Sequence, residues 1–181
     1  PIRYTTTASN DPVSRLQRQI SSGEITLEYD QKHGYLPSVL RTLGIPISSQ
    51  MLVFSKTSFQ RDLISPRTPR ALYFNDHTYI GTVQGGPVLE VTSVDPQLGA
   101  VFYVLSQEKR DKPKFARMTH ECLQCHESGM TLGVPGHIMR SVYPDAAGQP
   151  ILTAGTFVTT DQSPLKERWG GWYVTGTHGE Q

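Results

Sequence analysis

The sequence predicts an α+β fold, in which an antiparallel β-sheet is accompanied by a few flanking helices. Four segments rich in valine, isoleucine and aromatic residues follow one another in the middle of the chain, and turn signals separate them. Segments with helical spacing of apolar residues precede them. The composition agrees, because 36% hydrophobic and 18% charged residues, with 16 glycines and 13 prolines among 181 residues, are typical of a loop-rich globular protein.

The N-terminal part of the chain predicts an arm followed by a helix. Residues 1–10 are polar and are expected to form the arm. Residues 11–181 are expected to form a single domain, either alone or as one domain of a longer protein. Asp11-Pro12 is typical of a helix start, with aspartate as the cap and proline in the first turn, and Gly23 is expected to end this helix.

Three shorter elements are expected before the main sheet. Residues 25–29 alternate between apolar and polar side chains, which favours a short strand. Residues 36–43 have the apolar spacing of a compact helix, and Gly44 is expected to end it. Residues 51–54 favour a second short strand.

The clearest regular structure is an antiparallel meander. Its expected strands are residues 70–74, 78–83, 88–94 and 100–105. Their connections contain turn residues, namely Asn75-Asp76, Gly85-Gly86-Pro87 and the segment 95–99. Towards the C-terminus, residues 138–143 and 151–158 predict a second hairpin.

Between these two groups of strands the sequence predicts a helix that leads into the most informative motif of the chain. Phe115, Met118 and Cys122 would share one face of that helix, at the spacing i, i+3, i+7. The motif at its C-terminal end is Cys122-Leu123-Gln124-Cys125-His126, and it contains both cysteines of the protein.

This C-x-x-C-H pattern is typical of the covalent attachment of a c-type haem. The chemistry requires this order, because each thiol adds across one vinyl group of the porphyrin while the adjacent histidine supplies an imidazole to the iron. We therefore expect one covalently attached haem c, held by Cys122, Cys125 and His126.

Three other interpretations of the motif stay open. A C-x-x-C pair also occurs in thioredoxin-like redox sites, although these need a βαβ context that the sequence does not suggest. The pair could form half of a zinc site with His126, His120 or His137, although no further cysteine exists to complete a second knuckle. A disulfide between the two cysteines would close too short a loop to constrain the chain much.

The second axial position of the iron decides between electron transfer and ligand binding. We favour His178, which makes His126 and His178 the expected metal ligands, because Gly176 and Gly179 let the backbone approach a flat macrocycle closely. The alternatives are Met139, which would raise the reduction potential, His137, and an open position. More remote candidates are His33, His77, His120, Met118 and Met130.

Arginines are candidates for pairing with the haem propionates, because a planar guanidinium matches a carboxylate. The candidates are Arg117, Arg140 and Arg168. A locally basic stretch elsewhere is expected to be a solvated face instead; it comprises Lys56, Arg61, Arg67 and Arg70.

The attachment motif resembles that of c-type cytochromes, whereas the scaffold does not resemble the all-helical fold of small cytochromes c. In that family the motif lies near the start of the chain, but here it begins at residue 122 of 181. An α+β fold like that of sensory PAS or Cache domains fits better, by analogy of fold alone. Most of the chain resembles an uncharacterised group of exported bacterial proteins with a cytochrome-c-type domain; the matching segments are residues 34–40, 52–58, 70–76 and 168–179.

These resemblances imply a monohaem c-type cytochrome domain that transfers single electrons through a bis-ligated, low-spin haem. They imply export to the periplasm, because this kind of haem is attached outside the cytoplasmic membrane. A chain that opens at Pro1 fits either a processed protein or a piece excised from a longer one. The expected partners are redox proteins or a larger respiratory or photosynthetic complex. A net charge of +1 does not indicate nucleic acid, and the apolar runs are too short for a membrane span.

The main alternative is a sensor domain whose haem has an open or weakly ligated distal site and binds NO, CO or O₂. A haem peroxidase would need an open distal site with a positioned acid–base residue. The sequence contains no GxSxG, HExxH or glycine-rich phosphate loop, so we do not expect an enzyme.

Overall fold

The computed structural model describes residues 2–164 and 170–173, and it has the α+β fold that the sequence predicts. Six antiparallel strands form the main sheet in the order β1-β2-β3-β4-β5-β6, and two more form a separate hairpin, β7-β8. The strands are β1 (Met51–Val53), β2 (Arg70–Phe74), β3 (Thr78–Val83), β4 (Val88–Asp95), β5 (Gly99–Ser106), β6 (Phe115–Met118), β7 (Met139–Val142) and β8 (Thr156–Thr159). The helices are α1 (Pro12–Ser22), α2 (Leu36–Thr42) and α3 (Leu123–His126), with 3₁₀ turns at Ile47–Ser49, Arg61–Leu63, Gly129–Thr131 and Leu152–Ala154.

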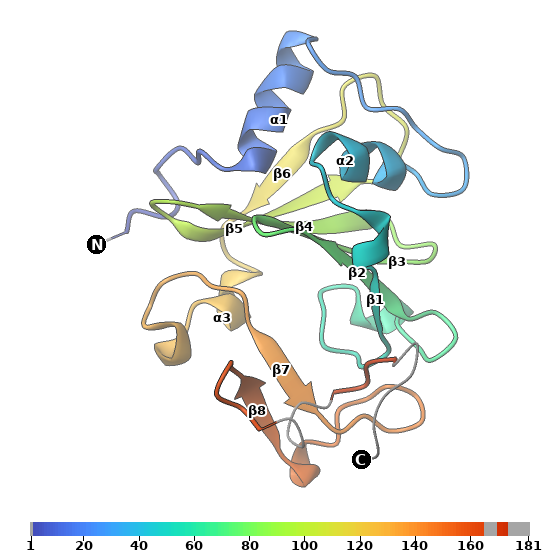
Figure 1. The fold of residues 1–181 in the computed structure, drawn as a ribbon, viewed down its shortest axis with the longest axis vertical. Coiled ribbons are helices and arrows are strands. Elements are labelled where there is room, and N and C mark those ends of the chain that lie inside the picture. The colour runs from blue at the N-terminus through green and yellow to red at the C-terminus, as the bar shows by residue number, and fades with distance from the viewer. Residues whose placement is uncertain (1, 165–169, 174–181) are drawn as a thin grey trace.

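The two faces of the main sheet have different neighbours. Figure 1 shows α1 and α2 on one side of the sheet and α3 with the β7-β8 hairpin on the other. The side chains that alternate along β4 make this division clear, because Leu89 and Val91 are buried in the core with α1 and α2. Glu90 and Thr92 point the opposite way, as neighbouring residues of a strand must, towards the side of α3.

The first helix begins and ends where the sequence predicts. The Asp11 carboxylate accepts hydrogen bonds from the backbone N–H groups of Val13 and Ser14, and Gly23 ends the helix with a left-handed conformation. Asp11 also accepts a hydrogen bond of 2.6 Å from the hydroxyl of Tyr103 on β5. Because Asp11 is fully buried, this one carboxylate both caps α1 and fixes it to the sheet.

The segment expected to be an arm packs against the sheet. Tyr4 is buried and donates a hydrogen bond to the Ala100 carbonyl. Arg117 of β6 donates hydrogen bonds to the carbonyls of Thr7 and Tyr4 and lies over the Tyr4 ring. The N-terminal residues therefore belong to the same packed body as β5 and β6.

Two expected elements are wrong. Residues 25–29 form no strand; Leu27 packs into the core, while the Tyr29 hydroxyl bonds to the Gln107 carbonyl. Residues 115–118 form the edge strand β6 in place of the first half of a helix, and Phe115 pairs with Leu105 of β5. On this strand Phe115 and Arg117 share a face. Because Arg117 is charged, the sequence does not show the apolar alternation of a strand, and the burial of Arg117 depends on carbonyls that are distant in the chain.

The C-terminal hairpin is confirmed, with a later second strand. Residues 152–154 form a 3₁₀ turn, so β8 begins at Thr156. The hairpin is tied to the main sheet through the backbone, because Lys56 N–H donates to the Gly148 carbonyl. The described aromatic segment also lies beside β1, where Tyr173 N–H donates to Leu52 and Phe54 N–H donates to Gly171.

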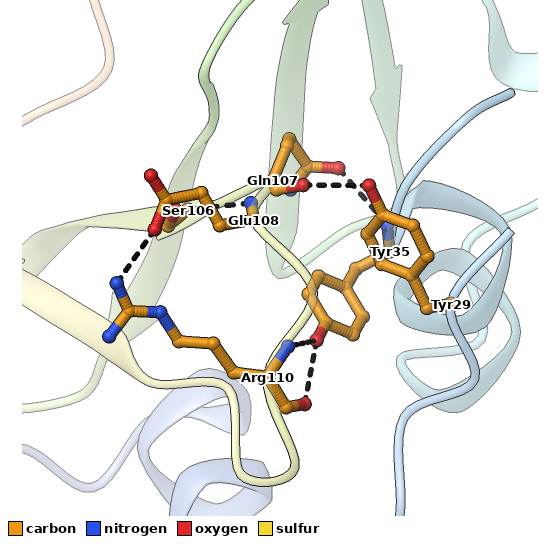
Figure 2. A network of polar contacts seen from close by, with 6 residues as sticks. All are labelled: Tyr29, Tyr35, Ser106, Gln107, Glu108 and Arg110. Atoms are coloured by element: carbon orange, nitrogen blue, oxygen red, sulfur yellow. Dashed lines mark hydrogen bonds and ion pairs between the residues drawn. The ribbon is translucent and has the colours of Figure 1, made fainter. Parts of the chain in front are cut away.

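A polar network fixes the loop after β5 to the loop before α2 (Figure 2). The fully buried Tyr35 donates its hydroxyl to the Arg110 carbonyl at 2.8 Å and accepts from the Arg110 N–H at 2.7 Å. The Tyr35 backbone N–H donates to Gln107 Oε1 at 3.0 Å. Gly34 makes this approach possible, because it has φ +60° and a Cβ there would lie 2.1 Å from Gln107 Oε1.

Gly34→Ala should therefore destabilise the fold by about 2–3 kcal/mol, combining the left-handed backbone penalty with the loss of the Gln107 bond. The matched control is Gly44→Ala, since Gly44 has φ +63° but open space around its Cβ position. Urea denaturation of both variants measures the difference. Equal losses of unfolding free energy would contradict the role given to the Gln107 contact.

Candidate functional site

The C-x-x-C-H motif lies on a single helical turn. Cys122 precedes α3, and its carbonyl accepts the backbone N–H of His126 at 3.0 Å. Residues three and four positions apart share a face of a helix, so both cysteines and His126 point from the same side of this turn. Both cysteines are free thiols, Cys125 exposed and Cys122 half-buried.

The His126 ring is held in one orientation. Its Nδ1 lies 2.9 Å from the carbonyl oxygen of Gly136, and the Gly136 N–H donates back to the His126 carbonyl at 3.0 Å. Since a carbonyl can only accept, Nδ1 must carry the proton, which leaves Nε2 with a free lone pair. In metal-binding histidines, a hydrogen bond of this kind from the nitrogen that does not bind the metal fixes the tautomer and the orientation of the ring.

The ring of His126 also packs on the sheet. Its centroid lies 4.6 Å from that of Phe102 on β5, with an angle of 42° between the rings. Burial lowers the pKa of His126 below its usual range, and the bond to Gly136 opposes this shift. His126 is therefore a largely neutral imidazole at pH 7, which is the form that binds a metal.

The sheet under α3 carries an ion pair close to the motif. Arg70 of β2 reaches Glu90 of β4, with 2.5 Å between Nη2 and Oε2, and the two side chains are 21% and 15% exposed. The intervening residue of β3 is Gly81, where a Cβ would lie 2.4 Å from the Arg70 guanidinium. The other Glu90 oxygen accepts from the backbone and side chain of Gln60.

The pair of Arg70 and Glu90 was not predicted from the sequence, which placed Arg70 on a solvated basic face. Arg70 is half-buried and paired, so it does not belong to a solvated basic face. The glycine in the middle of β3 was the available signal, because a glycine inside a strand often marks a close approach by another group.

The charge of Glu90 reaches the motif. Burial raises the pKa of the Cys122 thiol to about 11, and the negative charges of Glu90, Glu121 and Cys125 contribute to the shift. Glu90 also raises the pKa of His126, while Arg70 lowers it. The ion pair is therefore part of the electrostatic environment of the motif.

The other candidate residues for the haem site lie in several different places. His178 lies outside the described residues, as do Arg168 and the Met130 side chain. Met139 is 48% exposed on β7. Met118 is half-buried on β6, where it pairs with Phe102. His33 pairs with Asp30, and His77 and His120 are exposed.

His137 packs on the same sheet as His126. It directly follows Gly136, and its ring lies 4.6 Å from that of Tyr79 on β3, while its Nε2 lies 3.0 Å from the Thr92 hydroxyl.

The two described candidate arginines have different surroundings. Arg117 donates hydrogen bonds to the N-terminal carbonyls of Thr7 and Tyr4. Arg140 is exposed on β7.

A separate hollow of about 560 Å³ borders the other side of α3, between that helix and the N-terminal segment. Its lining contains none of the two cysteines, His126 or His137; the lining residues are Ile2, Arg3, Tyr4, Thr5, Thr6, Thr119, His120, Leu123, Gln124 and Glu127. The two middle residues of the motif, Leu123 and Gln124, border this hollow, whereas its cysteines and His126 do not.

The described residues do not assemble a conventional metal cluster or a membrane helix. Within residues 2–164 and 170–173, no group of three or more histidine, cysteine, aspartate or glutamate side chains is arranged to hold a metal ion. In the same part of the chain, no helix has the length and apolar character needed to cross a membrane.

Comparisons with known proteins give no relative. A scan against protein-family models, a search of curated proteins and a search of solved structures each find no match to this chain. The functional argument therefore depends on the motif and its surroundings in the structure.

The two thiols should differ in reactivity in protein made without haem attachment. Because Cys122 is half-buried and its pKa is raised to about 11, and because the thiolate is the reactive form, Cys125 should be alkylated at least tenfold faster at pH 8. Peptide mass spectrometry after timed iodoacetamide treatment measures both rates. Equal rates at pH 8 would contradict the described environment of Cys122.

Proposed function

We propose that this chain is a monohaem c-type cytochrome domain that transfers single electrons. The observation that carries the proposal is the hydrogen bond from His126 Nδ1 to the Gly136 carbonyl, on a helical turn that presents both free thiols on the same side. These are the groups that covalent haem attachment needs, and one of the histidine nitrogens is already directed for coordination.

Three residues of the motif would hold the group. Cys122 and Cys125 would each be joined to it by a thioether, since an S–H group that adds across a vinyl C=C bond leaves its sulfur on one carbon and its proton on the other. His126 would offer Nε2 to the iron, while the Gly136 carbonyl keeps the proton on Nδ1. A bound haem would supply the Fe(III)/Fe(II) couple.

The sheet face beneath α3 would shield one side of the group. Phe102 supports the His126 ring, and the half-buried ion pair of Arg70 and Glu90 places compensated charge nearby. Low exposure of the cofactor and fixed charges around it are two of the factors that set a reduction potential.

We infer from the same chemistry that the protein acts in the periplasm and exchanges electrons with redox proteins, alone or within a larger respiratory or photosynthetic assembly. The support is the attachment motif, since thioether formation takes place outside the cytoplasmic membrane.

Denaturing electrophoresis with haem staining tests the attachment. Protein matured with the haem-attachment machinery should keep its haem on denaturation, and Cys122→Ala with Cys125→Ala should abolish that retention. Zinc content measured on the same samples covers the competing assignment. Stoichiometric zinc without covalent haem would overturn the proposal.

The ion pair leads to a prediction for the reduction potential. Glu90→Gln removes a negative charge close to the motif and leaves Arg70 uncompensated, so it should raise the potential by roughly tens of millivolts. The matched control is Glu28→Gln, because Glu28 pairs with Arg41 but both side chains are well exposed. Spectroelectrochemical titration measures both variants, and an unchanged potential in Glu90→Gln would exclude this electrostatic role.

A further inference from the structure

We propose that the hollow between α3 and the N-terminal segment binds a small organic carboxylate. The hollow has a volume of about 560 Å³, which lies within the usual range for small-molecule sites. Neither cysteine nor His126 lines it, so the proposal does not depend on haem attachment. It gives the chain a second binding site, next to the C-x-x-C-H motif but separate from it.

The fold holds the wall that the N-terminal segment forms. The Arg3 carbonyl accepts the backbone N–H of Thr7 at 2.9 Å, which closes a turn in this segment. Tyr4 within the turn is buried, and Arg117 of β6 donates hydrogen bonds to the carbonyls of Tyr4 and Thr7. The turn is therefore tied to the edge of the main sheet, and the side chains that it directs into the hollow start from a fixed backbone.

The opposite wall is formed by α3 and the residues before it. Leu123 is half-buried and packs against the main core. The backbone N–H of Gln124 donates to the His120 carbonyl at 3.2 Å, and that of Glu127 donates to the Leu123 carbonyl at 2.9 Å. Both walls are thus held without a ligand, so binding requires little ordering of the chain.

The lining is rich in hydrogen-bond donors that have no partner within the described part of the chain. Guanidinium, hydroxyl and amide groups all donate, and an imidazole keeps at least one N–H in either protonation state. The side chains concerned are those of Arg3, Thr5, Thr6, Thr119, His120 and Gln124. A ligand with several acceptor oxygens would satisfy them.

The charged side chains of the lining favour an anion bound at Arg3. A planar guanidinium matches a carboxylate and can pair with it through two parallel hydrogen bonds. Glu127 is the one acidic side chain among the described residues of the lining, and an ionised carboxylate only accepts hydrogen bonds. The carboxylate of the ligand is therefore expected to bind at Arg3 and to be repelled by Glu127.

Apolar surface in the same lining distinguishes an organic acid from an inorganic anion. This surface comes from Ile2, which is 41% exposed, from the half-buried Leu123 and from the edge of Tyr4. Phosphate and sulfate have no apolar part to cover such surface, whereas the body of an organic acid gains free energy by covering it. The lining thus fits a carboxylate attached to an aromatic or aliphatic group.

Isothermal titration calorimetry of the full chain with phenylacetate tests the site. We expect saturable binding with a Kd of about 1 mM, the scale that a ligand of this size reaches in an open site. Phenylacetamide, which has no charge, and acetate, which has no ring, should each bind about fivefold more weakly or worse.

Charge variants locate the binding. Arg3→Gln should weaken the binding of phenylacetate by about fivefold, and Glu127→Gln should tighten it by about twofold, because each changes one charge of the lining. The matched controls are Arg18→Gln and Glu121→Gln, which change the same charges outside the lining. All four side chains are exposed, so urea denaturation should show unchanged stability in each variant.

The contrary outcomes are distinct. Absence of saturable binding of phenylacetate would overturn the proposal, and so would equally tight binding of phenylacetamide. Equal losses of affinity in Arg3→Gln and Arg18→Gln would show that the hollow is not the site. Haem staining reports attachment separately, so a chain that binds phenylacetate through Arg3 but takes up no haem would support this inference and contradict the proposed function alone.

Discussion

The alternation of side chains along the central strands is the constraint on which the rest of the structure depends. Because neighbouring residues of a strand point to opposite faces, Leu89 and Val91 complete the core beneath α1 and α2 while Glu90 and Thr92 face α3. A register shift of one residue would exchange these sets. The stability of the fold and the chemistry of the candidate site are thus encoded on alternate positions of the same strand.

The carbonyl of Gly136 connects that scaffold to the motif. The motif itself is only one helical turn, too short to orient its side chains by its own stability. Its orientation depends on the segment after it, which bonds to His126 through Gly136 and to the start of β5 through Pro135. The sheet therefore fixes the orientation of His126, the candidate ligand, although this residue lies on a helix of a single turn.

Much of the fold could be predicted because its signals are local. Asp11 and Gly23 begin and end a helix through contacts with nearby residues, and the turns of the meander are equally local. The C-x-x-C-H pattern can be recognised from five consecutive residues. The rest depends on partners that are distant in the chain. The sequence predicts a helix at Phe115, whereas the structure has a strand there, because the half-buried Arg117 of that strand bonds to N-terminal carbonyls that are distant in the chain. The pairing of Arg70 with Glu90 likewise requires three strands in register.

A crystal structure of the haem-loaded protein is the most direct test of the central claim, that α3 and the sheet face beneath it form one cofactor site. We expect thioether bonds to both cysteines, iron bound to Nε2 of His126, and a macrocycle beside the sheet face that carries Phe102. A macrocycle in the hollow beside the N-terminal segment, lined by Tyr4 and Leu123, would contradict it, as would iron bound without His126.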